Sequence, residues 1–278
     1  MNGRKTGAGE YLHKMKAFRV LKEPVIKQVL ESLTLPAGSK GLDVGCGDGY
    51  YTLMLAESAG PGSHATGIDV TGPFLDQGRA LSSKFSLTER VSFIKGDIED
   101  LRFEKNTFDW VFSIDCVELF TQDPVSMCKK LAAMIKPGGS LFILNLSSQQ
   151  LLPGYHVLEA RLNATSSGMA PFAPGMKPDL HGLRSLGWLQ NSGFVNLSAA
   201  TYVRDVTSPF SDDIREGLLN LFEMRWGGNN PESSKKDQLE YKRLCRGDSP
   251  DCILDIPGYY GFFTYSLFQG NLLNECGC

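Results

Sequence analysis

Between residues 24 and 146, short apolar runs alternate with stretches whose apolar residues recur at helical spacing. This alternation is typical of a parallel sheet covered by helices on both faces, so a doubly wound α/β fold is expected. A first helix is predicted to begin at Pro24, because Ile26, Val29 and Leu30 share one face. The predicted strands are 41–45, 65–70, 91–95, 110–114 and 140–146, and the predicted helices between them are 50–58, 73–85 and 124–135.

The pattern changes after residue 146. A stretch rich in proline and glycine, residues 152–178, predicts a long loop, and loops of this length are usually functional or mobile. The insertion 203–260 contains at least one amphipathic helix, for which Ser211 supplies an N-cap. The other predicted elements are a helical pattern at 183–189, strands at 194–202 and 261–268, and a polar connection at 227–238.

Composition narrows the class of protein. The 278 residues carry 28 lysines and arginines against 31 aspartates and glutamates, a net charge of −3, and 42% are hydrophobic. Ordinary apolar content and low charge exclude intrinsic disorder. No basic excess is available for nucleic-acid phosphates, so nucleic acid is not expected as a partner. The apolar stretches are shorter than the roughly 20 residues that a membrane helix needs.

The seven cysteines follow no disulfide framework, and residues 1–20 lack a cationic and apolar leader, so a cytoplasmic location is expected. Six residues separate Cys245 from Cys252, and one residue separates Cys276 from Cys278. Neither pair has the C-x-x-C spacing of a zinc site, so no metal is predicted. The roles of these four cysteines stay open.

A glycine-rich segment, residues 42–49 with the sequence LDVGCGDG, stands where the first strand gives way to a helix. Glycines at alternate positions allow a tight turn and a close approach of backbone to a ligand. A dinucleotide pattern would need glycine at position 50, which is Tyr50. Asp43 would repel a pyrophosphate and attract a cation, so a cationic ligand is favoured.

Two further acids follow the second and third strands. Asp69 stands 20 residues beyond Gly49, and a carboxylate there can accept both hydroxyls of a ribose. Asp97, with the backbone amide of Ile98, can meet the amino group and ring nitrogen of adenine. Together these positions indicate an adenosine with a positively charged, amino-acid-like end.

On these residues the chain resembles the class I S-adenosylmethionine-dependent methyltransferases. Within them it is most similar to the small-molecule branch that includes ubiquinone and menaquinone biosynthesis methyltransferases. The segments that carry the resemblance are 42–49, Asp69, 96–98, 108–112 and 135–139. The resemblance implies a doubly wound, mostly parallel seven-stranded sheet with helical lid insertions, and S-adenosyl-L-methionine as the cofactor.

The family's cofactor contacts carry over to matching positions of this chain. Gly45 and Gly47 would pack against the methionine part, and Asp43 would order its ammonium. The other implied contacts are Asp69 with ribose, Val70 and Ile98 with adenine, Asp97 with its amino group, Ile114 and Asp115 beside the methyl, and Tyr11 over the methionine end.

A general base is needed where the acceptor atom loses a proton. The candidates are Asp115, Glu118, Tyr155, His156 and His181, and no spacing selects one of them. Asp115 is equally suited to capping the segment after a strand, and the histidines to ordinary loop and helix-start positions.

The resemblance also divides the chain into functional segments. Residues 147–180 and 203–258 are expected to cover a small-molecule acceptor. A largely aromatic cover would favour an acceptor with apolar surface. Its aromatic residues are Phe222, Trp226, Tyr259 and Tyr260, and it also includes Met224. The predicted domains are an N-terminal helical cap (1–40), a cofactor-binding core (41–146), an insertion with a return to the sheet (147–202), a helical lid (203–258), and the last strand and tail (259–278).

Three other functions stay open. The chain could methylate a protein or another macromolecule, although the motif typical of base methylation is missing at residues 113–117. It could bind the cofactor without turnover. A nicotinamide oxidoreductase is disfavoured by Tyr50. The sequence identifies neither the acceptor, nor the methylated atom, nor the oligomeric state.

Overall fold

The computed structural model describes residues 8–100, 102–117, 123–165, 177–227 and 232–274, without the side chains of residues 8–15. The chain divides into two compact units. Unit 1 comprises Met1–Lys27, Leu146–His181 and Tyr202–Tyr265, and unit 2 comprises Gln28–Asn145, Gly182–Thr201 and Ser266–Cys278. The predicted domain boundaries of the sequence analysis stay a prediction.

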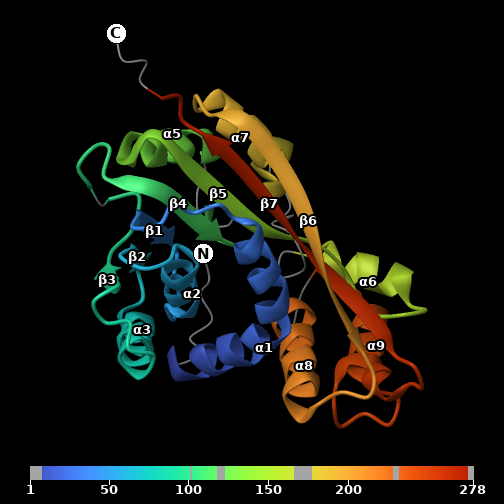
Figure 1. The fold of residues 1–278 in the computed structure, drawn as a ribbon. Helices are drawn as coiled ribbons and strands as arrows, with labels where there is room; N and C mark the ends of the chain where they lie inside the picture. The colour runs from blue at the N-terminus through green and yellow to red at the C-terminus, as the bar shows by residue number, and fades with distance from the viewer. Residues whose placement is uncertain (1–7, 101, 118–122, 166–176, 228–231, 275–278) are drawn as a thin grey trace. The chain divides into compact units, whose positions relative to one another are not determined.

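Within the described residues, seven strands form one sheet in the order β3-β2-β1-β4-β5-β7-β6 (Figure 1). They are β1 (Lys40–Val44), β2 (His64–Asp69), β3 (Val91–Lys95), β4 (Phe108–Ile114), β5 (Ile135–Gln150), β6 (Val195–Thr207) and β7 (Tyr260–Asn271). Among the first five strands, β1 pairs with β2 and β4, β2 with β3, and β4 with β5, and all four pairs are parallel. The predicted doubly wound, mostly parallel fold is confirmed, and the carboxyl ends of β1, β2 and β4 lie at one edge of the sheet.

The two faces of the sheet in unit 2 carry different helices. On one face, Leu42, Val111 and Ile143 pack with residues of α5 (Pro124–Met134) and α7 (Ser185–Asn191). On the other face, the Phe93 ring of β3 lies against Gly78 of α3 (Gly72–Lys84) and Gly49, which precedes α2 (Tyr50–Ser58). Alternation of side chains along each strand produces this division.

In unit 1 the main helices are α6 (His156–Asn163), α8 (Asp212–Trp226) and α9 (Lys235–Cys245). The predicted N-cap of α8 is present, because the Ser211 side chain accepts the N–H of Ile214. Leu218, Leu221 and Phe222 form the buried face of this helix, as its amphipathic pattern predicts. Within the described residues, no helix has the length and apolar content needed to cross a membrane.

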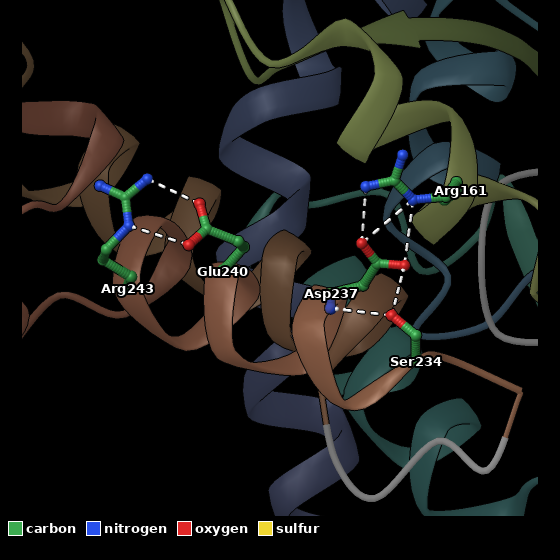
Figure 2. Close-up of polar contacts among 5 residues, drawn as sticks. All are labelled: Arg161, Ser234, Asp237, Glu240 and Arg243. Carbon is green, nitrogen blue, oxygen red and sulfur yellow. Dashed lines mark hydrogen bonds and ion pairs between the residues drawn. The ribbon is translucent and has the colours of Figure 1, made fainter.

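An ion-pair network joins α6 to α9 (Figure 2). The Arg161 guanidinium donates to both carboxylate oxygens of Asp237, at 2.7 to 3.0 Å. Ser234 caps α9 by accepting the N–H of Asp237 at 3.0 Å. One turn further along α9, Arg243 pairs with Glu240 at 2.7 Å.

The predicted start of the first helix at Pro24 is wrong. Helix α1 spans Ala8–Ser32, with Pro24 inside it. A proline inside a helix costs one hydrogen bond and a clash, about 3 kcal/mol. Leu21, Val25 and Val29 are fully buried at helical spacing on both sides of Pro24, so burial of this face outweighs the local cost.

Two helices of unit 1 are absent from the sequence prediction. Helix α6 lies inside the predicted loop 152–178, and α9 begins inside the predicted polar connection 227–238. Both helices are short and only weakly apolar, so they have no clear helical pattern in the sequence. Packing against neighbouring helices contributes most of their stability. The long strands also exceed their predicted bounds, β5 most of all, because it includes the irregular turn at Pro137 to Gly139.

The aromatic residues expected to cover the acceptor differ in burial. Phe222 and Trp226 stack with ring centroids 5.4 Å apart and are buried. The Tyr259 hydroxyl donates to the Leu151 carbonyl at 2.9 Å, also inside unit 1. Tyr260 is exposed. Most of these rings therefore form the core of unit 1.

Candidate cofactor-binding site

The glycine segment of unit 2 forms the turn between β1 and α2. Gly45, Gly47 and Gly49 have φ values of 74°, 56° and 72°, in the left-handed region that side chains disfavour. A Cβ at Gly45 would lie 2.4 Å from the Cys116 sulfur, and one at Gly49 would lie 2.5 Å from the Phe93 ring. Both conformation and space therefore require glycine at these two positions.

Asp69 joins the end of β2 to this turn. Its carboxylate accepts the N–H of Gly47 at 3.0 Å and the N–H of Thr71 at 2.8 Å. The side chain is half-buried at the carboxyl edge of the sheet. A carboxylate has about four lone-pair positions, so these two bonds leave capacity for hydroxyl donors of a ligand.

Asp43 is a buried acid of the site. It is 2% exposed on β1, and one of its oxygens accepts the Thr52 hydroxyl of α2 at 2.6 Å. Thr52 is itself fully buried. The bond fixes the carboxylate below the glycine turn with a neutral donor, which leaves its negative charge in place.

Two cysteine thiols, Cys46 in the turn and Cys116 beside it, are close enough to these acids for the negative charges to raise their pKa values. Burial raises the pKa of the Cys46 thiol, and the nearby Asp43 and Asp69 raise it further. Burial, with Asp69 and Asp43, also raises the pKa of Cys116 to about 12. Both thiols are therefore protonated at neutral pH, in a region that favours a cation.

Asp115 ends β4 in a left-handed conformation, with φ of 48°. Its amide donates to the Leu144 carbonyl of β5 at 2.9 Å, which ties this turn to the neighbouring strand. Such conformations are uncommon outside glycine and often occur at functional sites. Asp115 stands at the same edge of the sheet as Asp69.

Asp97 is exposed, and its carboxylate accepts the N–H of Glu99 at 2.9 Å, as in an ordinary turn. Ile98 packs on the core of unit 2, and Val70 is 59% exposed. The contacts of these three residues with adenine stay a prediction.

Residues 42–139 match the family model described as a methyltransferase domain. The demethylmenaquinone methyltransferases of Staphylococcus aureus strains JH9 and Newman are 34% identical to this chain over 134 residues. That alignment covers 48% of this chain and 54% of each relative, so the chain spans about half the length of the curated relatives it matches. Residues 42–139 are a methyltransferase domain. For this segment, the predicted resemblance to class I S-adenosylmethionine-dependent methyltransferases is confirmed.

Solved structures agree with this methyltransferase domain in fold. A geranyl diphosphate methyltransferase in complex with SAM has a TM-score of 0.53 and 13% identity, and the match covers 98% of this chain and 93% of that one. A putative methyltransferase bound to the Haloferax volcanii Trm112 activator has a TM-score of 0.56 and 16% identity, covering 95% and 94%. At these identities the likeness establishes the fold alone.

Of the predicted cofactor contacts in this domain, Gly47 is bonded to Asp69, while Asp43 and Gly45 belong to the end of β1 and the turn that follows it. Of the other predicted contacts, Tyr11 lies on α1, where its side chain is not described.

The candidate general bases belong to different parts of the chain. Glu118 lies outside the described residues. His156, exposed, begins α6, and the Tyr155 ring lies 5.6 Å from the Arg243 guanidinium. Burial lowers the pKa of His181. These three residues belong to unit 1. Among the described candidates, Asp115 belongs to unit 2, where it directly precedes Cys116, whose sulfur lies against Gly45 of the glycine turn.

Sequence reasoning missed Thr52 and Cys116. A hydroxyl three residues after the last glycine, on the first turn of α2, is the signal that could have identified Thr52. Cys116 has no local signal, because its contact with Gly45 depends on the pairing of β1 with β4. Among the described residues, no cluster of three or more histidine, cysteine, aspartate or glutamate side chains could hold a metal.

Proposed function

We propose that the chain transfers a methyl group from S-adenosyl-L-methionine to a small-molecule acceptor. The observation that carries this proposal is the bond from the Gly47 amide to Asp69, because it joins the three-glycine turn and the acid at the end of β2 into one site. The methyltransferase domain match over residues 42–139 supports the same activity.

Residues of unit 2 are the proposed partners of the ribose, the adenine, the ammonium and the methyl group of the cofactor. Asp69 accepts the ribose hydroxyls, and Asp43 orders the methionine ammonium directly or through water. Gly45 and Gly47 leave space for the methionine chain. The remaining proposed contacts are Val70, Asp97 and Ile98 at adenine, Tyr11 at the methionine end, and Ile114 and Asp115 beside the methyl.

Methyl transfer from a sulfonium is an in-line displacement with a neutral thioether as the leaving group. The protein's main tasks are to align the acceptor and to exclude water. The protonated state of Cys116 suits this role, because a thiol is a far weaker nucleophile than a thiolate. In this proposal the Cys116 thiol is therefore not the methyl acceptor.

The class of acceptor is a further part of the proposal. The similar Staphylococcus aureus proteins are named for demethylmenaquinone, which favours a partly apolar, quinone-like acceptor here. By the same resemblance, residues 147–180 and 203–258 are proposed to cover the acceptor, and Asp115 or His156 is proposed to remove a proton where one is lost. A cytoplasmic location without a nucleic-acid partner belongs to the same proposal.

Product analysis tests this function. Purified protein is incubated with methyl-labelled S-adenosylmethionine and demethylated quinols, phenols and amines, and S-adenosylhomocysteine is quantified by mass spectrometry. We expect acceptor-dependent S-adenosylhomocysteine with a quinol or phenol. Tight cofactor binding without product from any acceptor would instead indicate a binding protein without turnover, and label in added protein would indicate a macromolecular acceptor.

A further inference from the structure

Three glycines from three parts of unit 2 make room for one phenylalanine ring. Gly67 belongs to β2, Gly78 to α3, and Gly49 is the last glycine of the turn before α2. A Cβ at these positions would lie 3.0, 2.8 and 2.5 Å, respectively, from the Phe93 ring of β3. Packed carbon atoms stay roughly 3.5 Å apart or more. The ring therefore occupies the space that a side chain would need at each of these positions.

Contacts outside the turn fix the position of Phe93. It lies opposite Gly67 in the parallel pairing of β2 with β3, and its carbonyl accepts a hydrogen bond from the Arg79 guanidinium of α3 at 3.1 Å. Its ring lies against Gly78 of the same helix. Helices α2 and α3 lie side by side (Figure 1). The strand and α3 therefore hold the ring in place next to the turn.

Gly49 is the residue at which the turn and α2 meet. Its N–H donates to the Cys46 carbonyl at 3.0 Å, which closes the turn. Its own carbonyl accepts the N–H of Leu53 at 3.2 Å, which is a bond of the first turn of α2. A shift of Gly49 would therefore move the turn and the beginning of the helix together.

The ring also meets the other end of the turn, through Cys46. A Cβ at Gly67 would lie 2.8 Å from the Cys46 sulfur and 3.0 Å from the Phe93 ring, so the sulfur and the ring are neighbours over the same glycine. Cys46 precedes Gly47, whose amide donates to Asp69 at 3.0 Å. The amide that joins the turn to Asp69 therefore lies between the two places that the ring supports.

We propose that Phe93 is a positioning residue of the cofactor site, because its ring supports the glycine turn in the conformation that the methionine part of S-adenosylmethionine would meet. The identity of this ligand rests on the proposed function. Different atoms of the ring make the different contacts: Cδ1 lies next to Gly67, whereas Cε1 and Cζ at the tip lie next to Gly49. Phe93→Leu keeps atoms for the first contact and removes those of the second.

Amide hydrogen exchange of the ligand-free chain tests the support of the turn. In Phe93→Leu we expect the Gly49 amide to exchange about tenfold faster or more, because its bond to the Cys46 carbonyl opens more often. Val91→Ala is the matched control, since Val91 is a buried residue on the same face of β3, at the beginning of the strand and away from its carboxyl edge. We expect it to change exchange at Gly49 by less than about twofold.

Calorimetry on the full chain then tests the effect on ligands. We expect Phe93→Leu to weaken S-adenosylhomocysteine about fivefold and adenosine, which lacks the methionine part, by less than about twofold. Gly78→Ala is a second variant that keeps the ring but places a Cβ 2.8 Å from it. It should displace the ring and weaken S-adenosylhomocysteine selectively as well. Val91→Ala should leave both affinities unchanged.

Phe93 has no positioning role if Phe93→Leu changes exchange at Gly49 no more than Val91→Ala does, or if it weakens both ligands equally. If neither ligand binds the unsubstituted protein while the exchange result holds, the proposed function is wrong and the support of the turn by Phe93 is upheld.

Discussion

The carboxylates around the glycine turn of unit 2 and those of α9 in unit 1 accept hydrogen bonds from different donors. Around the glycine turn of unit 2, Asp43 accepts a threonine hydroxyl and Asp69 accepts backbone amides. In unit 1, Asp237 is paired with Arg161, and Glu240 with Arg243. Neutral donors leave a carboxylate's charge available to a cationic ligand, whereas an arginine neutralises it. The first arrangement suits binding of a cation, and the second suits holding helices together.

The largest expected effect comes from Gly45→Ala. Its left-handed φ costs about 1 to 2 kcal/mol for a side chain, and the contact with Cys116 adds roughly 1 to 3 kcal/mol. Gly38→Ala is the control, because Gly38 has the same φ of 74° with nothing within 4 Å. Urea unfolding of both variants checks this, and equal losses would contradict the steric account.

Asp69→Ala is expected to remove charge-assisted bonds to the ribose worth about 1.5 to 3 kcal/mol, roughly 10- to 150-fold in cofactor affinity. Isothermal titration with S-adenosylhomocysteine measures the change. Asp76→Ala is the control, because Asp76 is an exposed carboxylate of α3 that pairs with Arg79 and is not among the proposed cofactor contacts. Unchanged affinity in the Asp69 variant would remove its proposed role.

Thr52→Val separates the charge of Asp43 from the rest of the site. The variant keeps the volume of the side chain but loses the hydroxyl that orients the carboxylate. We expect affinity for S-adenosylmethionine to fall about tenfold, while affinity for adenosine, which lacks the ammonium, changes less than about twofold. Thr52→Ser should restore most of the loss. A parallel fall for both ligands would point to a structural role instead.

The smallest effect is expected from the ion pairs of unit 1. The Arg161 guanidinium holds the pKa of Asp237 below its ordinary value of 3.8. A lowered folded pKa stabilises the protein above pH 3.8, and this contribution is lost as the pH falls through the folded value. Asp237→Asn should therefore reduce stability at pH 7, on the order of 1 kcal/mol, and should reduce it less at pH 3.

Asp248→Asn is the control for that variant, because Asp248 and Arg246 are both exposed and screened by solvent. We expect no measurable change in its unfolding midpoint at pH 7. If the two variants lose the same stability, burial of Asp237 contributes nothing beyond an ordinary surface ion pair.

Local patterns predict most of unit 2. The bounds of α2 and β3 agree with the apolar periodicity, because each element completes its buried face within a few residues. The glycine turn and Asp69 follow from spacing along the chain. The Thr52 bond to Asp43 was not predicted, since it joins a helix to a strand across the turn.

Unit 1 depends on contacts between residues distant in sequence. Arg161 and Asp237 are 76 positions apart, and Tyr259 bonds a carbonyl 108 positions away. No local pattern encodes such pairs. Helix α9 is strongly polar, and its main sequence signal was the cap from Ser234 to Asp237. The predicted helix start at Pro24 was wrong because burial of the apolar face of α1 outweighs the cost of a proline inside the helix.

The most direct test of the glycine-turn site is a calorimetric comparison of ligands on the full chain. S-adenosylmethionine and S-adenosylhomocysteine should bind at one site, adenosine should bind more weakly, and NADH should give no heat. Heat from NADH, or no heat from either adenosyl ligand, would contradict the assignment of Asp43, Asp69 and the three glycines to this cofactor.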